Sequence, residues 1–158
     1  VQPMILYLKN HDASIPVVGT GVVITHIVNN RGDWGGGFTA SLSPESYATY
    51  REMIDNPSEY GLGSMQLEPI GDKDYLCHMM AQDNLTPNRA VRVDYDALDK
   101  CLLRLDIALD TLQLPVQMPR IGTGIGGGSW TIIEELIRRR LHNRFVYVCD
   151  YEPRKREP

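Results

Sequence analysis

Residues 121–130 read IGTGIGGGSW, and this stretch decides how the rest of the chain is interpreted, because five of its ten residues are glycine. Residues 116–121 (VQMPRI) before it are expected to form a short buried strand. Residues 131–141 after it have helical spacing, with Ser129 as the expected cap and Trp130 in the first turn. The residues expected on the buried face of that helix are Ile132, Ile133, Leu136, Ile137 and Leu141. The sequence therefore predicts a strand, a glycine loop and a helix N-terminus in succession.

A loop of this kind suits an anionic ligand. Glycine adopts positive φ easily and lets a ligand approach the backbone closely. Backbone N–H groups and the dipole of the following helix both favour negative charge. We therefore expect a phosphate group at this loop, and the alternative interpretation is an ordinary glycine-rich surface turn.

Size and composition indicate a single globular domain. A chain of 158 residues can bury a core without disulfides or metal, and we expect one domain over residues 1–151 and a short charged tail at 152–158. The net charge of −4 argues against nucleic-acid binding.

The three cysteines lack the paired spacing of a zinc site, which predicts reduced thiols in a cytoplasmic compartment. No apolar run approaches the ~20 residues of a membrane span, and no basic leader marks a signal peptide.

Apolar runs alternate with helical patterns along the chain, which predicts three α/β/α layers with ligands at the carboxyl ends of the strands. Strands are expected at residues 4–8, 22–28, 64–70, 75–81, 116–121 and 145–149, with a hairpin turn at 71–74. Further helices are expected after the cap Ser43, with Pro44 first, and over 94–112, with Leu98, Leu102, Leu105 and Leu109 in the core. Since residues 22–28 (VVITHIV) form a nearly continuous apolar run, that strand should be covered on both faces, with His26 a hydrogen-bonded core residue.

A second glycine loop, residues 29–38 (NNRGDWGGGF), also follows a buried strand and precedes a helix. Two such loops can close on one elongated anionic ligand from opposite sides. Within this loop, Asp33 can orient a water against a sugar or phosphate. The alternative role for Asp33 is an Asx-type turn with Gly32.

Other chemistries have less support. Gly122, Gly124 and Gly127 fit the G-x-G-x-x-G fingerprint, and Asp150 could then bind a ribose, so an NAD-dependent oxidoreductase is an alternative. That fingerprint normally opens its fold, whereas here only one further strand follows. The chain contains no G-K-[ST], G-x-S-x-G or H-E-x-x-H sequence, and we expect neither a metal nor a cofactor.

Four stretches carry a resemblance to a known family: HDAS at residues 11–14, VNNRGDWGGGF at 28–38, MAQDN at 80–84 and MPRIGTGIGGGSW at 118–130. Together they resemble macro domains, the ADP-ribose-binding family, and specifically the branch described as Appr-1-p processing proteins. The resemblance implies a mixed sheet of about six strands between helices, in agreement with the layers expected from the patterning.

The resemblance also implies the roles of individual residues. Asp12 resembles the acid that binds the adenine amino group, with the Ala13 backbone beside it, while Cys149, Asp150 and Tyr151 border the nucleoside. Asn29 and Asn30 resemble the loop of the distal ribose, and Gly35, Gly36, Gly37 and Phe38 line the pyrophosphate. The second phosphate loop is Gly122, Thr123, Gly124, Ile125, Gly126 and Gly127, with the hydroxyl of Thr123 available to the ligand.

Departures from the family pattern leave the activity open. Mono-ADP-ribosyl hydrolases carry an acid just after the glycine run, whereas this chain has Phe38 and Thr39 there. Other relatives act through a lysine–aspartate pair, which would need a lysine near Glu68 and an acid near Gly126, and this chain has neither. We predict hydrolysis of ADP-ribose 1″-phosphate or of an ADP-ribosyl ester, with Asp33 orienting water and Asn30 holding the distal ribose. The alternative is a binding module that recognises ADP-ribose, free or attached to a protein.

Overall fold

One mixed sheet lies at the centre of the computed structural model, which describes residues 4–150. Its six strands are β1 (Met4–Lys9), β2 (Val23–Asn29), β3 (Met65–Ile70), β4 (Asp74–Gln82), β5 (Val116–Met118) and β6 (Phe145–Asp150). Their order in the sheet is β1-β6-β5-β2-β4-β3, and every neighbouring pair is parallel except the β3–β4 hairpin. This arrangement confirms the expected mixed sheet. The predicted tail at 152–158 lies outside the described residues.

The helices begin where the capping residues predict. They are α1 (Pro44–Asp55), α2 (Tyr95–Leu112) and α3 (Trp130–Arg140), with a short 3₁₀ helix, η1 (Gly37–Ser41), after the first glycine loop. The Ser43 hydroxyl accepts the Ser46 N–H at 3.3 Å, and the Asp94 carboxylate accepts the Ala97 N–H at 2.9 Å. Ser129 occupies the cap position of α3, but its side chain makes no capping hydrogen bond.

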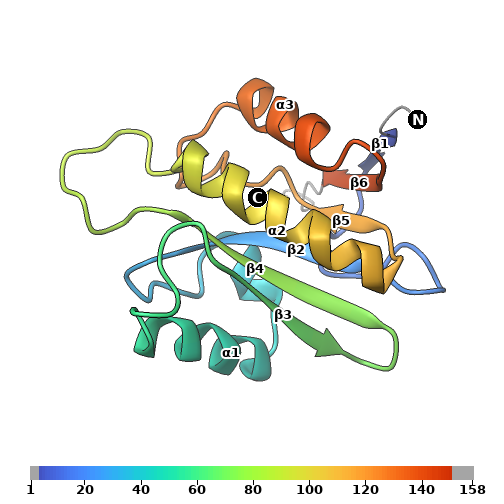
Figure 1. Cartoon of the computed structure of the whole chain (residues 1–158), viewed down its shortest axis with the longest axis horizontal. Coiled ribbons are helices and arrows are strands. Elements are labelled where there is room, and N and C mark those ends of the chain that lie inside the picture. Colours follow the sequence, from blue (N-terminus) through green and yellow to red (C-terminus); the bar gives the residue numbers. More distant parts are fainter. Residues whose placement is uncertain (1–3, 151–158) are drawn as a thin grey trace, which may run out of the picture.

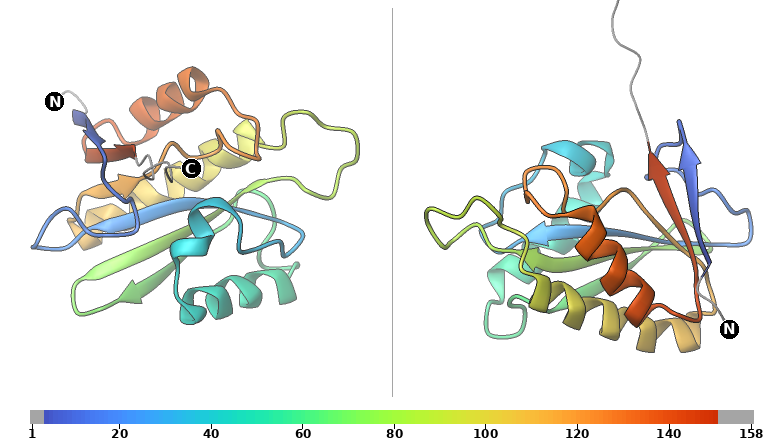
Figure 2. Two further views of the ribbon diagram at one scale, coloured as in Figure 1. Left: turned by 180° about the vertical axis from the view of Figure 1, so that it is seen from behind. Right: turned by 90° about the horizontal axis from the view of Figure 1, so that it is seen from above.

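The sheet is covered on both faces, which confirms the three layers (Figure 1). Successive residues of a strand point to opposite faces, so Val23 packs in the core under α2 and α3. Val28 packs with Tyr50 and Met53 of α1 on the other face. The two views of Figure 2 show α1 and η1 on one side of the sheet and α2 and α3 on the other. The leucines predicted for the core of α2, Leu98, Leu102, Leu105 and Leu109, are fully buried.

Two details differ from the sequence-based expectation. Strand β5 ends at Met118 rather than at residue 121, because Pro119 has no N–H to donate to a ladder. Ile132 is 46% exposed, whereas the other four residues expected on the buried face of α3 are buried. The buried stripe of α3 is centred on Ile133 and Ile137, one turn apart, and Ile132 lies about 100° around the helix from that stripe.

The parallel strands carry their carboxyl ends to one edge of the sheet. The loops that follow β1, β2, β4 and β5 therefore gather at that edge beside the carboxyl end of β6, where open α/β sheets bind their ligands. The turn at residues 71–74 lies at the opposite ends of the strands. No helix within residues 4–150 is both long and apolar enough to cross a membrane.

Candidate functional site

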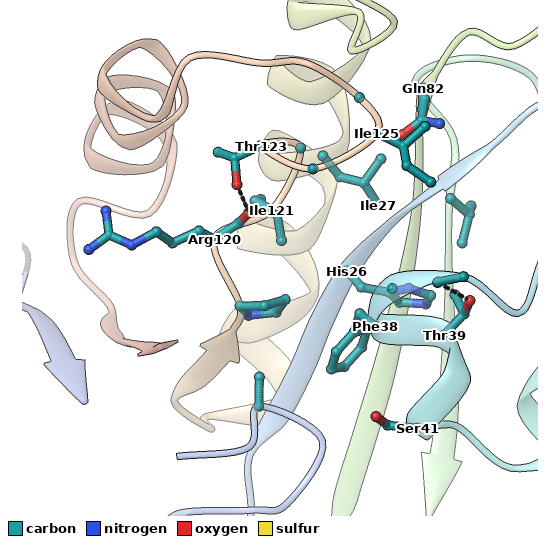
Figure 3. Close-up of a pocket in the computed structure, with 18 of the residues that line it drawn as sticks. His26, Ile27, Phe38, Thr39, Ser41, Gln82, Arg120, Ile121, Thr123 and Ile125 are labelled. Carbon is teal, nitrogen blue, oxygen red and sulfur yellow. Dashed lines mark hydrogen bonds between the residues drawn. The ribbon is translucent and has the colours of Figure 1, made fainter. Parts of the chain in front are cut away.

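A cleft of 1460 Å³ runs along this edge of the sheet. Each of the four loops and the end of β6 contribute to its walls, and Figure 3 shows the arrangement around its centre. Fourteen of the residues predicted for the site line the cleft: Asp12, Ala13, Asn29, Asp33, Gly36, Gly37, Phe38, Gly122, Thr123, Gly124, Ile125, Gly126, Cys149 and Asp150. Residues 10 and 120 of the sequence, more than a hundred positions apart, meet in this cleft.

The two glycine loops face each other across the cleft. A β-carbon placed on Gly36 would lie 3.9 Å from Cδ1 of Ile125, so the loops approach to van der Waals distance. Among the described residues, the backbone N–H groups of Gly36, Gly37, Gly124 and Gly126 make no hydrogen bond. Free N–H groups on opposite walls are what an elongated phosphate ligand requires.

Close packing explains the glycines of the second loop. The carbonyl of Gly126 accepts the N–H groups of Arg92 and Val93 at 2.8 and 3.1 Å, which ties the loop to the segment before α2. The Gly128 N–H donates to the Gly122 carbonyl at 2.7 Å. A β-carbon on Gly126 would lie 2.6 Å from Val93, so no larger residue fits there without movement.

Asn29 builds the first loop. Its Oδ1 accepts the backbone N–H groups of Arg31, Gly32 and Asp33 at 3.0, 3.1 and 3.1 Å. The Tyr50 hydroxyl donates to the same side chain at 3.0 Å. The turn predicted as an alternative role for Asp33 is therefore made by Asn29, and that interpretation of Asp33 is wrong.

Asp33 lies on the cleft wall as an ion-paired carboxylate. Its Oδ2 accepts from Arg31 and from the Asn84 amide, both at 2.8 Å. These hydrogen bonds hold the pKa of the Asp33 carboxyl below its ordinary value. Asp33 is therefore ionised at neutral pH and is a weak proton acceptor.

Three predicted residues lie outside the lining of the cleft. Asn30 donates to Asp83 at 3.0 Å and accepts the Asn84 N–H at 2.8 Å, so it holds the loop after β4. The Gly35 N–H donates to the Thr39 hydroxyl at 2.9 Å. Gly127 packs under the Ala90 carbonyl, with a positive φ of 66°. Tyr151, also predicted for the site, lies outside the described part of the chain.

Asp12 and Ala13 form one end of the cleft, at the edge strand β1. Asp12 Oδ1 accepts the N–H and the hydroxyl of Ser14 at 2.9 and 2.7 Å, which leaves its second oxygen for a ligand. The carbonyl of buried Ala13 accepts from Gln117 of β5 at 2.8 Å. This end can therefore present a carboxylate oxygen to an amino group.

Arg120 is a cleft residue to which the sequence analysis assigned no role. It makes a two-point ion pair with Asp150, at 2.7 and 3.1 Å, and its guanidinium lies over the rings of Tyr7 and Trp130. The Arg120 hydrogen bonds lower the pKa of Asp150. The sequence signal that could have identified Arg120 as a site residue is its position between a strand and a glycine loop.

Cys149 precedes Asp150 in β6 and also lines the cleft. Burial raises the pKa of the Cys149 thiol to about 11, so that thiol stays protonated at neutral pH.

His26 departs in part from the prediction of a fully hydrogen-bonded core histidine. It is 2% exposed, and its Nε2 lies 2.8 Å from Nδ1 of His78. The other ring nitrogen, Nδ1, is buried and has no hydrogen-bond partner among the described residues. The His26 ring also forms part of the cleft wall (Figure 3).

Comparisons with known proteins agree with this geometry. No protein-family model matches the chain. A solved macrodomain protein from Streptomyces coelicolor superposes with a TM-score of 0.79 at 29% identity, over 94% of this chain and 99% of that one. An ADP-ribose 1″-phosphate phosphatase from Lodderomyces elongisporus is 30% identical over 144 residues, which cover 84% of this chain and 89% of that protein. The chain belongs to the macro domain family.

A third relative is much longer than this macro domain. The chromodomain-helicase-DNA-binding protein 1-like of Danio rerio is 31% identical over 143 residues, but the chain spans only 14% of that protein. Membership of the macro domain family also argues against the alternative of an NAD-dependent oxidoreductase with a dinucleotide-binding fold. The loop with G-x-G-x-x-G spacing follows β5 of a macro domain sheet, and Asp150, which that alternative placed on a ribose, is paired with Arg120.

Proposed function

We propose that this macro domain binds ADP-ribose or a close derivative in the cleft and hydrolyses a bond at its distal end. The observation that carries the proposal is the pair of glycine loops with free N–H groups on opposite walls. A pyrophosphate between them would be held by backbone donors without a lysine or a metal. Asp12, at the β1 end of the cleft, suits an adenine amino group, which leaves the distal ribose at the β2 end.

The proposed substrate is ADP-ribose 1″-phosphate. The fungal relative is named for the removal of this phosphate, and this chain covers 89% of it. Two facing loops can hold a terminal phosphate as well as a pyrophosphate, and N–H groups aimed at developing charge stabilise a transition state. An ADP-ribosyl ester is the second substrate that the same cleft would accept.

A binding module is the second candidate function. The observation in its favour is that both residues predicted to act in hydrolysis are engaged elsewhere. Asp33 is ion-paired with Arg31, and Asn30 is hydrogen-bonded to Asp83. In this alternative the domain recognises ADP-ribose, including ADP-ribose attached to a protein, and turns nothing over.

The proposal includes a reducing compartment such as the cytoplasm. Cys77, Cys101 and Cys149 are all buried and unpaired among the residues that the structure describes. Free buried thiols are typical of proteins kept under reducing conditions.

The deciding experiment incubates the protein with ADP-ribose 1″-phosphate and with an ester-linked ADP-ribosyl peptide, and measures ADP-ribose affinity by calorimetry. Asp33→Ala and Asn30→Ala test the predicted roles, and Asp72→Ala, on the exposed hairpin turn, is the matched control. Turnover by wild type and by the control, lost in the two variants while ADP-ribose still binds, supports both roles. Tight binding without turnover makes the domain a binding module, and absence of ADP-ribose binding overturns the proposal.

A further inference from the structure

A second hollow adjoins the cleft beyond the carboxyl ends of β2 and β4. It has a volume of 440 Å³, and its wall is formed by Arg31 of the first glycine loop and by the loop between β4 and α2. That loop, drawn in yellow-green, projects from the edge of the sheet at the left of Figure 1. Arg31, Asn84 and Arg92 line both the hollow and the cleft, so the two spaces share a wall. A group held in the hollow would therefore lie next to a ligand in the cleft.

Three arginines give this hollow its chemical character. Arg31, Arg89 and Arg92 are among the eight residues of its lining, none of which is acidic, and we call it the arginine hollow. The cluster is notable in a chain whose net charge is −4. Cations gathered on a concave surface raise the local concentration of anions. The arginine hollow therefore suits an anionic ligand.

Hydrogen bonds within the loop hold two of the three arginines in place. The Asp83 carboxylate accepts the N–H groups of Leu85 and Thr86 at 3.0 and 3.2 Å, and it also accepts from Arg89 at 3.1 Å. The ends of the loop are joined by a bond from the Asp83 N–H to the Arg92 carbonyl at 2.8 Å. A ligand that meets side chains held in this way loses less affinity to the ordering of the site.

The ion pairs around the hollow leave one positive charge unbalanced. Arg31 pairs with Asp33 at 2.8 Å, and Arg89 pairs with Asp83 at 3.1 Å. Arg92 is partly buried and pairs with no carboxylate among residues 4–150. A guanidinium carries five N–H donors and binds phosphate through two of them at once. The charge and the donors of Arg92 are therefore available to a phosphate group.

We propose that the arginine hollow is a phosphate subsite, which holds the terminal phosphate of ADP-ribose 1″-phosphate. This inference rests on the proposed binding of ADP-ribose with its adenine at the Asp12 end of the cleft. Sheet order puts β2 and β4 away from β1, so the hollow lies on the side proposed for the distal ribose. The glycine loops then hold the pyrophosphate, and the arginines distinguish ADP-ribose with a terminal phosphate from ADP-ribose without one.

Calorimetry with two ligands tests this subsite without any turnover. The first ligand is ADP-ribose. The second is the 1″-phosphonate analogue of ADP-ribose 1″-phosphate, in which a methylene group replaces the bridging oxygen and prevents hydrolysis. The readout is the preference, defined as the Kd of ADP-ribose divided by the Kd of the phosphonate.

Two variants each remove one guanidinium from the hollow, Arg92→Gln and Arg89→Gln. The matched control is Arg104→Gln, which makes the same change in net charge. Arg104 is an exposed residue of α2 that lines neither the cleft nor the hollow.

In the wild type we expect a preference of about 10-fold or more, the usual effect of one hydrogen bond to a charged group. In Arg92→Gln the preference should fall to about 3-fold or less, and in Arg89→Gln it should fall at least about two-fold. The control should keep the wild-type preference. Added salt should reduce the preference of the wild type, because these arginines are partly exposed and their charges are screened.

Equal affinity of the wild type for the two ligands overturns the subsite and leaves the binding of ADP-ribose standing. A preference that survives in Arg92→Gln, or that falls equally in Arg104→Gln, also overturns it, since the effect would then not come from the hollow. If Arg92→Gln does not fold, an unchanged preference in Arg89→Gln has the same meaning. Absence of ADP-ribose binding by the wild type overturns the proposed function, and the subsite falls with it.

Discussion

Replacing Gly126 by alanine perturbs the second phosphate loop at a single point. The new β-carbon would lie 2.6 Å from Cγ2 of Val93 and 2.9 Å from the carbonyl oxygen of Gly122. Val93 is 2% exposed and β-branched, so its side chain has little freedom. The Gly122 carbonyl is held by the Gly128 N–H at 2.7 Å. The loop itself must therefore move, against the two hydrogen bonds from Arg92 and Val93 to the Gly126 carbonyl.

The size of the effect follows from these contacts. Overpacking in a closed site costs roughly 1–3 kcal/mol, and a strained backbone hydrogen bond adds about 1 kcal/mol at most. We expect the free energy of unfolding to fall by about 1–4 kcal/mol, which lowers Tm by roughly 2–16 °C in a chain of this length. One weakened hydrogen bond to a charged phosphate is worth about 1.5–3 kcal/mol, so ADP-ribose should bind at least ~10-fold more weakly.

Urea unfolding and calorimetry with ADP-ribose measure the two effects. Gly124→Ala is the matched control for unfolding, because a β-carbon on Gly124 meets no atom within 4 Å and its backbone is not left-handed. Its free energy of unfolding should stay within about 0.5 kcal/mol of the wild type. Equal unfolding of Gly126→Ala and wild type, or an equal loss in both variants, would refute the packing argument.

Three further outcomes are expected. Asp12→Asn keeps the acceptor oxygen of its turn and replaces the other oxygen by an amide, so AMP and ADP-ribose should bind about 1–3 kcal/mol more weakly, and unchanged calorimetry would remove Asp12 from the site. The Thr86 hydroxyl and neighbouring donors lower the pKa of Asp83, so its carboxylate stabilises the fold above pH ~4 and loses this contribution at lower pH. Urea unfolding of Asp83→Asn should therefore show a larger deficit at pH 7 than at pH 3, and equal deficits would contradict that cause. Leu105→Ala should cost about 2–5 kcal/mol in the same assay, while Ile107→Ala, at 61% exposed, should cost far less.

The sequence alone was sufficient for the order and type of the elements. Each helix is amphipathic or carries a recognisable cap, and β2 is mostly apolar because both of its faces are covered. These are local properties with a period of 2 or 3.6 residues, so they can be read from a short window. The two glycine loops were predicted for the same reason, since each glycine run stands directly after a buried strand.

Two features were less predictable: which residues of α3 are exposed, and where strand β5 ends. Ile132 fits the apolar spacing of α3 and is nevertheless 46% exposed, because the width of the buried stripe depends on where α2 and the sheet lie. β5 ends three residues early, at a proline whose effect on a parallel strand depends on its pairing.

Only the tertiary structure showed which polar side chains have a hydrogen-bond or ion-pair partner and which have none among the described residues. Asn84 meets Asp33, and Arg120 meets Asp150, through contacts between residues 51 and 30 positions apart. His26 and His78 lie 52 residues apart and become partners only because β2 and β4 pair in parallel with these two residues opposite each other. A hydrogen bond forms or fails when its donor and acceptor move by a few tenths of an ångström, and no sequence pattern contains that information. The sequence therefore predicted the phosphate loops, whereas only the tertiary structure showed that Nδ1 of His26 has no partner among the described residues.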